Sequence, residues 1–196
     1  MRGEIALTID DGPDPIVTPQ VLDLLQRHGV HASFFCVGEK LARHPILARE
    51  ISERGHSVEN HSQHHRAYFS LLGPQGMEQE ILAAQTLITA TTGRRPQFFR
   101  APAGLRNPFL DFVLAKHDLR LASWTRRGFD TVNGNAPRVL STLTRNLAAG
   151  DILLLHDGNA ARTVTGSPLI LEVLPPLLEA ISRAGLRTVT LPQALQ

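Results

Sequence analysis

The sequence predicts a parallel α/β fold in which short buried strands alternate with amphipathic helices. Seven short apolar runs alternate with helical patterns along the 196 residues. The runs are apolar throughout, as expected for strands of a sheet that helices cover on both faces. A helical pattern lies between successive runs, which is the arrangement of right-handed crossovers between parallel strands. The periodicity is consistent with a barrel and equally with an open doubly wound sheet.

The predicted strands are short apolar runs bounded by glycine, proline or polar residues. In chain order they span residues 4–9, 31–37, 56–60, 97–100, 119–124, 151–156 and 186–191. The single cysteine, Cys36, lies within the second run. We therefore expect a buried strand thiol there, and an internal disulfide is excluded.

The predicted helices have apolar residues three and four positions apart, and a glycine follows several of them as a stop signal. The clearest is 74–92, with Met77, Ile81, Ala84 and Ile88 on one side and Gly93 at its end. The full set is 17–28, 45–54, 74–92, 107–117, 137–149 and 169–184. The segments 128–137 and 159–168 are the longest predicted loops.

The composition predicts one globular domain over residues 1–196. Apolar residues make up 42% of the chain, enough for a sizeable core. Lys and Arg number 20 against 18 Asp and Glu, without a basic cluster, so we expect no nucleic-acid partner. No apolar run reaches the length of a transmembrane helix. A strand-like run follows Met1 almost at once, so no signal peptide is visible, and a segment trimmed upstream is left open.

Polar residues that could perform chemistry gather just after the predicted strands. In parallel α/β folds the carboxyl ends of the strands lie on one face, where active sites form. Residues far apart in the sequence could therefore meet in one pocket. These residues are Asp10, Asp11, His61, His65, Arg100, Asp130, His156 and Asp157.

His61 and His65 have the spacing of two metal ligands. Histidines four positions apart can face one ion from a single turn of chain, a spacing that His64 does not have. One carboxylate would complete a set that zinc hydrolases use, and non-haem iron oxygenases as well. The strand–helix alternation favours a hydrolase by fold analogy. A single His-x-x-x-His pair is weak evidence and gains weight only from the other motifs.

The adjacent carboxylates Asp10 and Asp11 precede Gly12-Pro13, a pattern that taken alone is typical of a turn with a capping acid. Buried together, they would repel each other unless a cation or an arginine lay nearby. Arg100 could pair with a carboxylate through two parallel hydrogen bonds. Strand alternation predicts that the two Asp side chains point in different directions and have separate roles.

His156 ends the apolar run that contains Leu154. A histidine there is most often a packed core residue. At a strand end that faces a pocket, it would instead be a proton donor, with its pKa tuned by a partner carboxylate.

Taken together, these segments resemble the polysaccharide deacetylase superfamily, carbohydrate esterase family 4, also called the NodB homology domain. The resemblance covers nearly the whole chain, and the motifs appear in the family's order. They are Thr8-Ile9-Asp10-Asp11-Gly12-Pro13, His61-Ser62-x-x-His65, Arg100-x-Pro102-x-Gly104 and Leu153-x-Leu155-His156. Each motif is weak alone, whereas four in order at suitable separations are a specific signature.

The resemblance implies a distorted (β/α) barrel of about seven units with parallel strands. It implies a hydrolase that removes N-acetyl groups from an amino-sugar polymer or oligomer, chitin-like or peptidoglycan-like. A divalent metal, usually zinc, would be held by Asp11, His61 and His65. Asp10 would be the general base, oriented by Arg100.

The resemblance also assigns the remaining roles. His156 would be the general acid. The backbone N–H of Ala103 would help to hold the oxyanion, and Leu154 would line the slot for the acetyl methyl group. An N-acetylated glycan is the expected partner, and an extracytoplasmic or envelope-associated location is the expected one.

One motif departs from the family pattern Asp-x-x-Asp-Trp. The matching stretch is Arg127-Gly128-Phe129-Asp130-Thr131, in which Asp130 remains and could tune His156. Arg127 replaces the first acid and Thr131 replaces the tryptophan. Trp124, three residues before Arg127, could supply aromatic surface for the substrate instead. The departure concerns the substrate groove, so the sequence does not name the glycan.

Two alternatives to this function stay open. The first is a deacetylase or amidase that acts on a different small amide or on a carbohydrate ester with the same scaffold. The second is an inactive carbohydrate-binding protein, which would be expected to lack a metal ligand or the base. No such residue is missing from the motifs.

Overall fold

The computed structural model describes residues 3–196 and contains one sheet of eight strands. The pairings between these strands are all parallel. The order is β5-β4-β3-β2-β1-β7-β6, and β8 pairs with the first residues of β1. The bounds are β1 (Glu4–Gly12), β2 (Ser33–Cys36), β3 (Ser57–Asn60), β4 (Phe98–Phe99), β5 (Arg120–Leu121), β6 (Arg126–Arg127), β7 (Ile152–His156) and β8 (Arg187–Val189).

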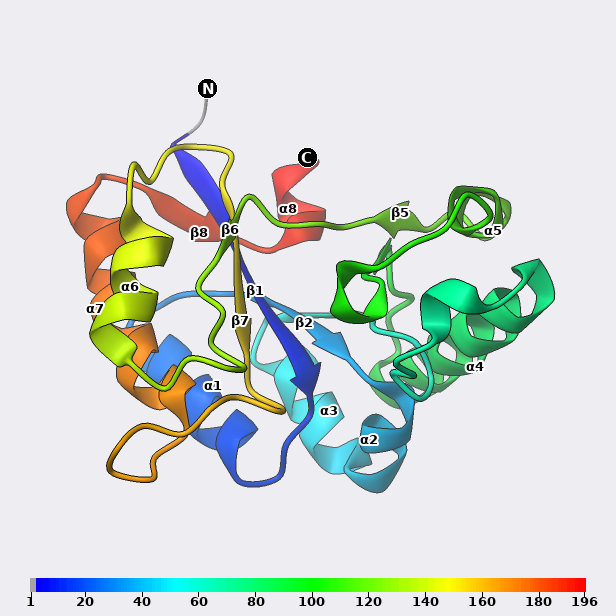
Figure 1. Cartoon of the computed structure of the whole chain (residues 1–196), viewed down its shortest axis with the longest axis horizontal. Coiled ribbons are helices and arrows are strands. Elements are labelled where there is room, and N and C mark those ends of the chain that lie inside the picture. Colours follow the sequence, from blue (N-terminus) through cyan, green and yellow to red (C-terminus); the bar gives the residue numbers. More distant parts are fainter. Residues whose placement is uncertain (1–2) are drawn as a thin grey trace.

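The sheet is curled into a partly open barrel. Its two ends, β5 and β6, are adjacent in the sequence. Leu121 and Arg126 are five residues apart, so the chain between them spans at most about 18 Å. A flat sheet would separate its edge strands by more than this, because neighbouring strands are about 4.8 Å apart. β1 lies at the centre, with β2 and β7 beside it (Figure 1).

Helices cover the outside of this curled sheet (Figure 1). On one side α6 packs on α7 and α7 packs on α1, while on the other α4 contacts α2, α3 and α5. The bounds are α1 (Val17–Arg27), α2 (Gly38–Arg43), α3 (Pro45–Glu53), α4 (Pro74–Thr92), α5 (Leu110–Lys116), α6 (Ala136–Thr144), α7 (Leu169–Arg183) and α8 (Leu191–Ala194).

The largest hydrophobic cluster joins the central strands to these helices. Leu7 and Ile9 of β1 and Leu153 of β7 are fully buried in it. The apolar faces of α1 and α7 contribute Leu22 and Leu177, which are likewise inaccessible to solvent. Burial of one such side chain stabilises the fold by about 1.5–3 kcal/mol. The central strands are therefore rigid supports for the side chains at their carboxyl ends.

The predicted fold class, a distorted parallel (β/α) barrel of about seven units, is confirmed. The predicted strand 119–124 was wrong in detail. The structure has β5 at Arg120–Leu121 and a separate two-residue strand, β6, at Arg126–Arg127. Two adjacent arginines give no apolar run, so periodicity cannot reveal β6. The short helices α2 and α8 were also missed.

Cys36 is buried in β2, as expected. Between residues 3 and 196, the structure contains no helix with both the length and the apolar character of a membrane span.

Candidate active site

A small cavity of about 210 Å³ lies at the carboxyl ends of β1, β3, β4 and β7. Loops from different parts of the chain meet there, as is usual for parallel α/β folds. The residues that line it are Asp10, Asp11, His61, His65, Ala101, Ala103, Gly104, Trp124, Arg127, Thr131, Leu154, His156 and Asn159. Of the candidate site residues, Arg100, Asp130 and Asp157 are absent from this wall. All three are buried.

Asp10 and Asp11 face the same cavity, so the expectation that they point in different directions was wrong. The pairing of β1 with β2 shifts register between Asp10 and Gly12, and Asp11 has a left-handed backbone with φ of 72°. This irregularity breaks the alternation of a regular strand and turns Asp11 toward the cavity. The two carboxylates nevertheless have different partners.

Asp11, His61 and His65 form a group with the geometry of a metal site. One ligand atom from each residue lies within 4.8 Å of the others. The Nε2 atoms of His61 and His65 lie 3.2 Å and 3.1 Å from the Oδ1 atom of Asp11. That buried oxygen has no hydrogen-bond partner in the part of the chain that the structure describes.

The tautomer of His61 explains why a cation fits here. Its Nδ1 lies 2.8 Å from the backbone carbonyl of Arg100, which can only accept a hydrogen bond. Nδ1 therefore carries the proton, and in the neutral ring Nε2 directs a lone pair at the Asp11 carboxylate. Two lone pairs facing each other repel unless a cation lies between them. Histidine ligands that donate their second nitrogen to a carbonyl are typical of protein metal sites.

The charges of Asp11, His61 and His65 also favour a bound cation. Burial alone would raise the pKa of Asp11, but the close His61 ring, with electrostatic attraction from His65 and His156, holds it well below its usual range. Burial and repulsion by His61 lower the pKa of His65. At neutral pH the group is thus a carboxylate with a neutral His65, the forms that bind a divalent ion.

Two further side chains hold Asp11 in place. The amide of Asn159 donates to Asp11 Oδ2 at 3.1 Å, so that Oδ1 is the oxygen left for an ion. The ammonium of Lys40 donates to the backbone carbonyl of Asp11 at 2.8 Å, supporting its left-handed backbone. Sequence reasoning missed both residues. Neither belongs to a recognised motif, and no signal in the sequence places them at this site.

Asp10 is paired with Arg100 beside the metal group. Arg100 Nη1 donates to Asp10 Oδ1 at 2.7 Å, and both side chains are almost completely buried. The guanidinium also donates to the Ser123 carbonyl and to the Thr8 hydroxyl, and it lies 4.1 Å from the centre of the Phe35 ring. These contacts hold the Arg100 side chain in one orientation. Arg100 in turn holds the Asp10 carboxylate in place. The other carboxylate oxygen, Oδ2, lies 3.8 Å from His61 Nε2.

His156 lies across the cavity and is paired with buried Asp130. Its Nδ1 is 2.9 Å from Asp130 Oδ1, and its backbone N–H donates to Asp130 Oδ2 at 2.8 Å. Burial would lower the pKa of His156, but the hydrogen bond and charge of Asp130, with the charges of Asp10 and Asp11, outweigh it and raise the pKa. The ring is therefore held with Nε2 free and with its protonated form favoured.

The remaining candidates contribute apolar surface to the cavity wall. They are Ala103, Leu154 and Trp124. Ala103 has a left-handed backbone, with φ of 54°. The Trp124 ring lies directly against Gly104, where any Cβ atom would overlap it. Gly104 also has a positive φ, so glycine is required there for two reasons.

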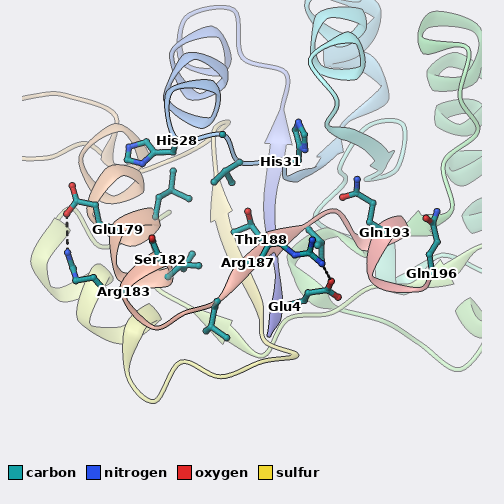
Figure 2. Close-up of a pocket in the computed structure, with 16 residues that line it drawn as sticks. Glu4, His28, His31, Glu179, Ser182, Arg183, Arg187, Thr188, Gln193 and Gln196 are labelled. Carbon is teal, nitrogen blue, oxygen red and sulfur yellow. Dashed lines mark hydrogen bonds and ion pairs between the residues drawn. The ribbon is translucent and has the colours of Figure 1, made fainter. Parts of the chain in front are cut away.

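A larger cavity of about 820 Å³ lies elsewhere, beside the start of β1 (Figure 2). Its polar side chains include two ion pairs, Glu4–Arg187 and Glu179–Arg183. No group of three metal-ligand side chains occurs there in residues 3–196. Cavity size alone therefore does not identify the active site, whereas the chemistry of the smaller cavity does.

Comparison with known proteins identifies the family of this chain. Residues 2–122 match the family described as polysaccharide deacetylase. The chain is 35% identical over 195 residues to a peptidoglycan-N-acetylglucosamine deacetylase of Bacillus cereus, covering 98% of this chain and 88% of that protein. It is 33% identical over 196 residues to a chitooligosaccharide deacetylase of Bradyrhizobium sp., covering 96% and 89%.

Among solved structures, the Bc1960 peptidoglycan N-acetylglucosamine deacetylase superimposes with a TM-score of 0.89 at 27% identity. The match covers 98% of this chain and 87% of that one. The family match spans more than half of the sequence, and the curated relatives cover nearly all of it. The chain belongs to the polysaccharide deacetylase family.

Proposed function

We propose that this protein is a metal-dependent hydrolase that removes N-acetyl groups from an amino-sugar glycan. One observation carries the proposal. The Asp11–His61–His65 group, the Asp10–Arg100 pair and the Asp130-bound His156 all meet at one cavity of about 210 Å³. Of the two relatives described above, one is named as a peptidoglycan-N-acetylglucosamine deacetylase and the other as a chitooligosaccharide deacetylase, which supports this substrate class.

The proposed metal ligands are Asp11, His61 and His65, with zinc as the expected ion. A bound divalent ion would supply Lewis-acid chemistry, polarising a carbonyl oxygen and making a water molecule more acidic. The donor set of two imidazoles and one carboxylate is typical of catalytic zinc sites.

Asp10 would accept the proton of the attacking water. Arg100 holds Asp10 Oδ1, which leaves Oδ2 as the proton acceptor on the cavity side. The charge-assisted hydrogen bond from Arg100 keeps this carboxylate in a fixed orientation. The backbone N–H of Ala103 would stabilise the oxyanion, an interaction worth about 3–4 kcal/mol for a well-placed donor. Leu154 would contact the acetyl methyl group.

His156 would protonate the leaving amine through Nε2, because Nδ1 is engaged with Asp130. The raised pKa of His156 keeps a proton available near neutral pH. An amine leaves only after protonation, whereas an alcohol leaves more readily. The Asp130–His156 pair therefore favours an amide substrate over a carbohydrate ester.

Acetate release and metal content, measured on the same purified variants, test the proposal. The substrates are chito-oligosaccharides, peptidoglycan glycan strands and acetylated xylan. We expect Asp10→Asn to abolish acetate release and to retain the metal. We expect His65→Ala to lose the metal.

His64→Ala is the matched control. His64 belongs to the same segment, but its ring pairs with Glu80 outside the metal group, so this variant should keep both metal and activity. Unchanged metal content in His65→Ala, or loss of metal in Asp10→Asn, would contradict the assigned roles. Wild-type protein that binds metal and releases acetate from none of the substrates would refute the function.

A further inference from the structure

Arg127 places an unpaired positive charge at the wall of the active-site cavity. It lies on β6, in register with Leu154 of β7, and both residues line the cavity. Its neighbour Arg126 is tied to Asp151 by an ion pair. Arg127 makes no ion pair with any carboxylate in the described range, 3–196, and its Nε–H is buried without a hydrogen-bond acceptor.

Within residues 3–196, none of the carboxylates in or near the cavity wall pairs with Arg127. Asp10 is paired with Arg100, Asp130 with His156, and Asp11 belongs to the metal group. The Arg127 side chain lines the cavity, so a ligand bound there can supply a hydrogen-bond acceptor that the protein does not. The missing partner of Arg127 is therefore an anion that enters the cavity with the substrate.

The guanidinium is also held in position for such a contact. Its central carbon lies 5.4 Å from the centre of the Trp124 ring and 5.0 Å from that of Phe129. These aromatic neighbours restrict the motion of the arginine without satisfying its donors. A positioned guanidinium presents its N–H groups in a fixed fork that matches a carboxylate.

We propose that Arg127 is a binding subsite for an anionic substituent, a carboxylate above all, on the N-acetylated glycan that this enzyme deacetylates. The inference rests on the proposed function and narrows its substrate class. The cavity, at about 210 Å³, is smaller than the roughly 300–1,000 Å³ of common ligand pockets, so it accommodates little more than one sugar unit. The anion must therefore lie on the reacting sugar or on its direct neighbour.

A matched pair of substrates tests this subsite. The first is peptidoglycan glycan strands without stem peptides, in which every second sugar carries a lactyl carboxylate. The second is the same strands with those carboxylates converted to methylamides. The measured quantity is the ratio of kcat/KM for the charged strands to kcat/KM for the amidated strands. For the wild-type protein we expect a ratio of about 10 to 100, the range for a charge-assisted hydrogen bond.

Three variants locate the source of this preference. Arg127→Gln should bring the ratio close to one, and Arg127→Lys should retain part of the preference, since it keeps the charge without the fork. Arg183→Gln is the control, because Arg183 is an exposed arginine of α7 in the remote cavity, and it should keep the wild-type ratio. If Arg127→Gln does not fold, the wild-type ratio must still fall as salt screens the contact.

A wild-type ratio near one, with acetate released from both strands, would overturn the subsite and leave the proposed function standing. An unchanged ratio in Arg127→Gln would overturn it as well, and so would a wild-type ratio that does not respond to salt. Absence of acetate release from both strands and from chito-oligosaccharides would instead count against the proposed function.

Discussion

His56 should make the folded protein sensitive to acid, at a position remote from the active site. Its ring is buried, and its Nδ1 accepts a hydrogen bond from the Ala32 N–H at 3.1 Å. Protonation at Nδ1 would place two donors face to face. Burial, helped by the charges of His31 and Arg54, lowers the pKa of His56 from 6.5 to about 4.

The unfolded chain therefore takes up this proton before the folded protein does as the pH falls. The stabilisation by neutral His56 is complete above about pH 6.5 and is lost between pH 6.5 and 4. The difference between the two pKa values corresponds to about 3 kcal/mol at full titration, and to about 2 kcal/mol at pH 5.

Urea unfolding followed by circular dichroism, at pH 8 and pH 5, measures this effect. Chelator is present throughout, because acid also releases a histidine-bound metal. The variant His56→Asn keeps an acceptor for Ala32 and cannot be protonated. The wild type should lose about 2 kcal/mol more than this variant between the two pH values. His28→Asn, at an exposed residue after α1, should behave as the wild type. Equal losses in wild type and His56→Asn would refute the reasoning.

Three further predictions concern the active site. Asp130→Asn removes the partner that raises the pKa of His156. The basic limb of the pH profile of kcat/KM should therefore move to lower pH, and kcat should fall by about 10²–10⁴-fold. A basic limb that does not move would exclude His156 as the acid. Asn159→Ala should weaken metal binding about 10–100-fold in a competition titration, because it frees Asp11 Oδ2; equal affinity would show that the contact is incidental. Zinc at 100 times its Kd should stabilise the metal-free protein by about 2.7 kcal/mol in thermal unfolding, and His65→Ala should show no such gain.

The location of the site could be predicted from the sequence because strand ends are visible there. His61 and His156 follow apolar runs, and parallel strands bring such ends to one face. The helix 74–92 was predicted with its observed bounds, because its apolar spacing is regular and Gly93, with φ of 70°, ends it. These features are local properties of the chain.

The direction of the Asp11 side chain could not be predicted in this way. It depends on a left-handed backbone that is supported by Lys40 from another element. The contact of Asn159 with Asp11 joins residues 148 positions apart and follows no periodicity. The isolation of Arg127 is equally invisible in the sequence, since it becomes apparent only when the partners of every nearby carboxylate are known.

Backbone strain is concentrated around the cavity. Eight non-glycine residues in the range 3–196 have a positive φ, and five of them line the cavity or are next in the sequence to a residue that does. The five are Asp11, Ser62, His65, Ala103 and Asn159. Each such conformation costs about 1–3 kcal/mol and persists only where surrounding contacts impose it.

For residues 61–65, which contain both histidine ligands, these contacts connect to helix α4 through Asn60. Asn60, fully buried at the end of β3, donates to the Ile81 carbonyl of α4 and accepts from the Ser62 N–H. The Ser62 hydroxyl accepts in turn from the His65 N–H. Helix α4 thus fixes His65 through a chain of hydrogen bonds, although it contributes no residue to the cavity. Hydrogen bonds within the protein thus support the position of His65, so loss of the Asn60 amide should weaken metal binding without removal of a ligand.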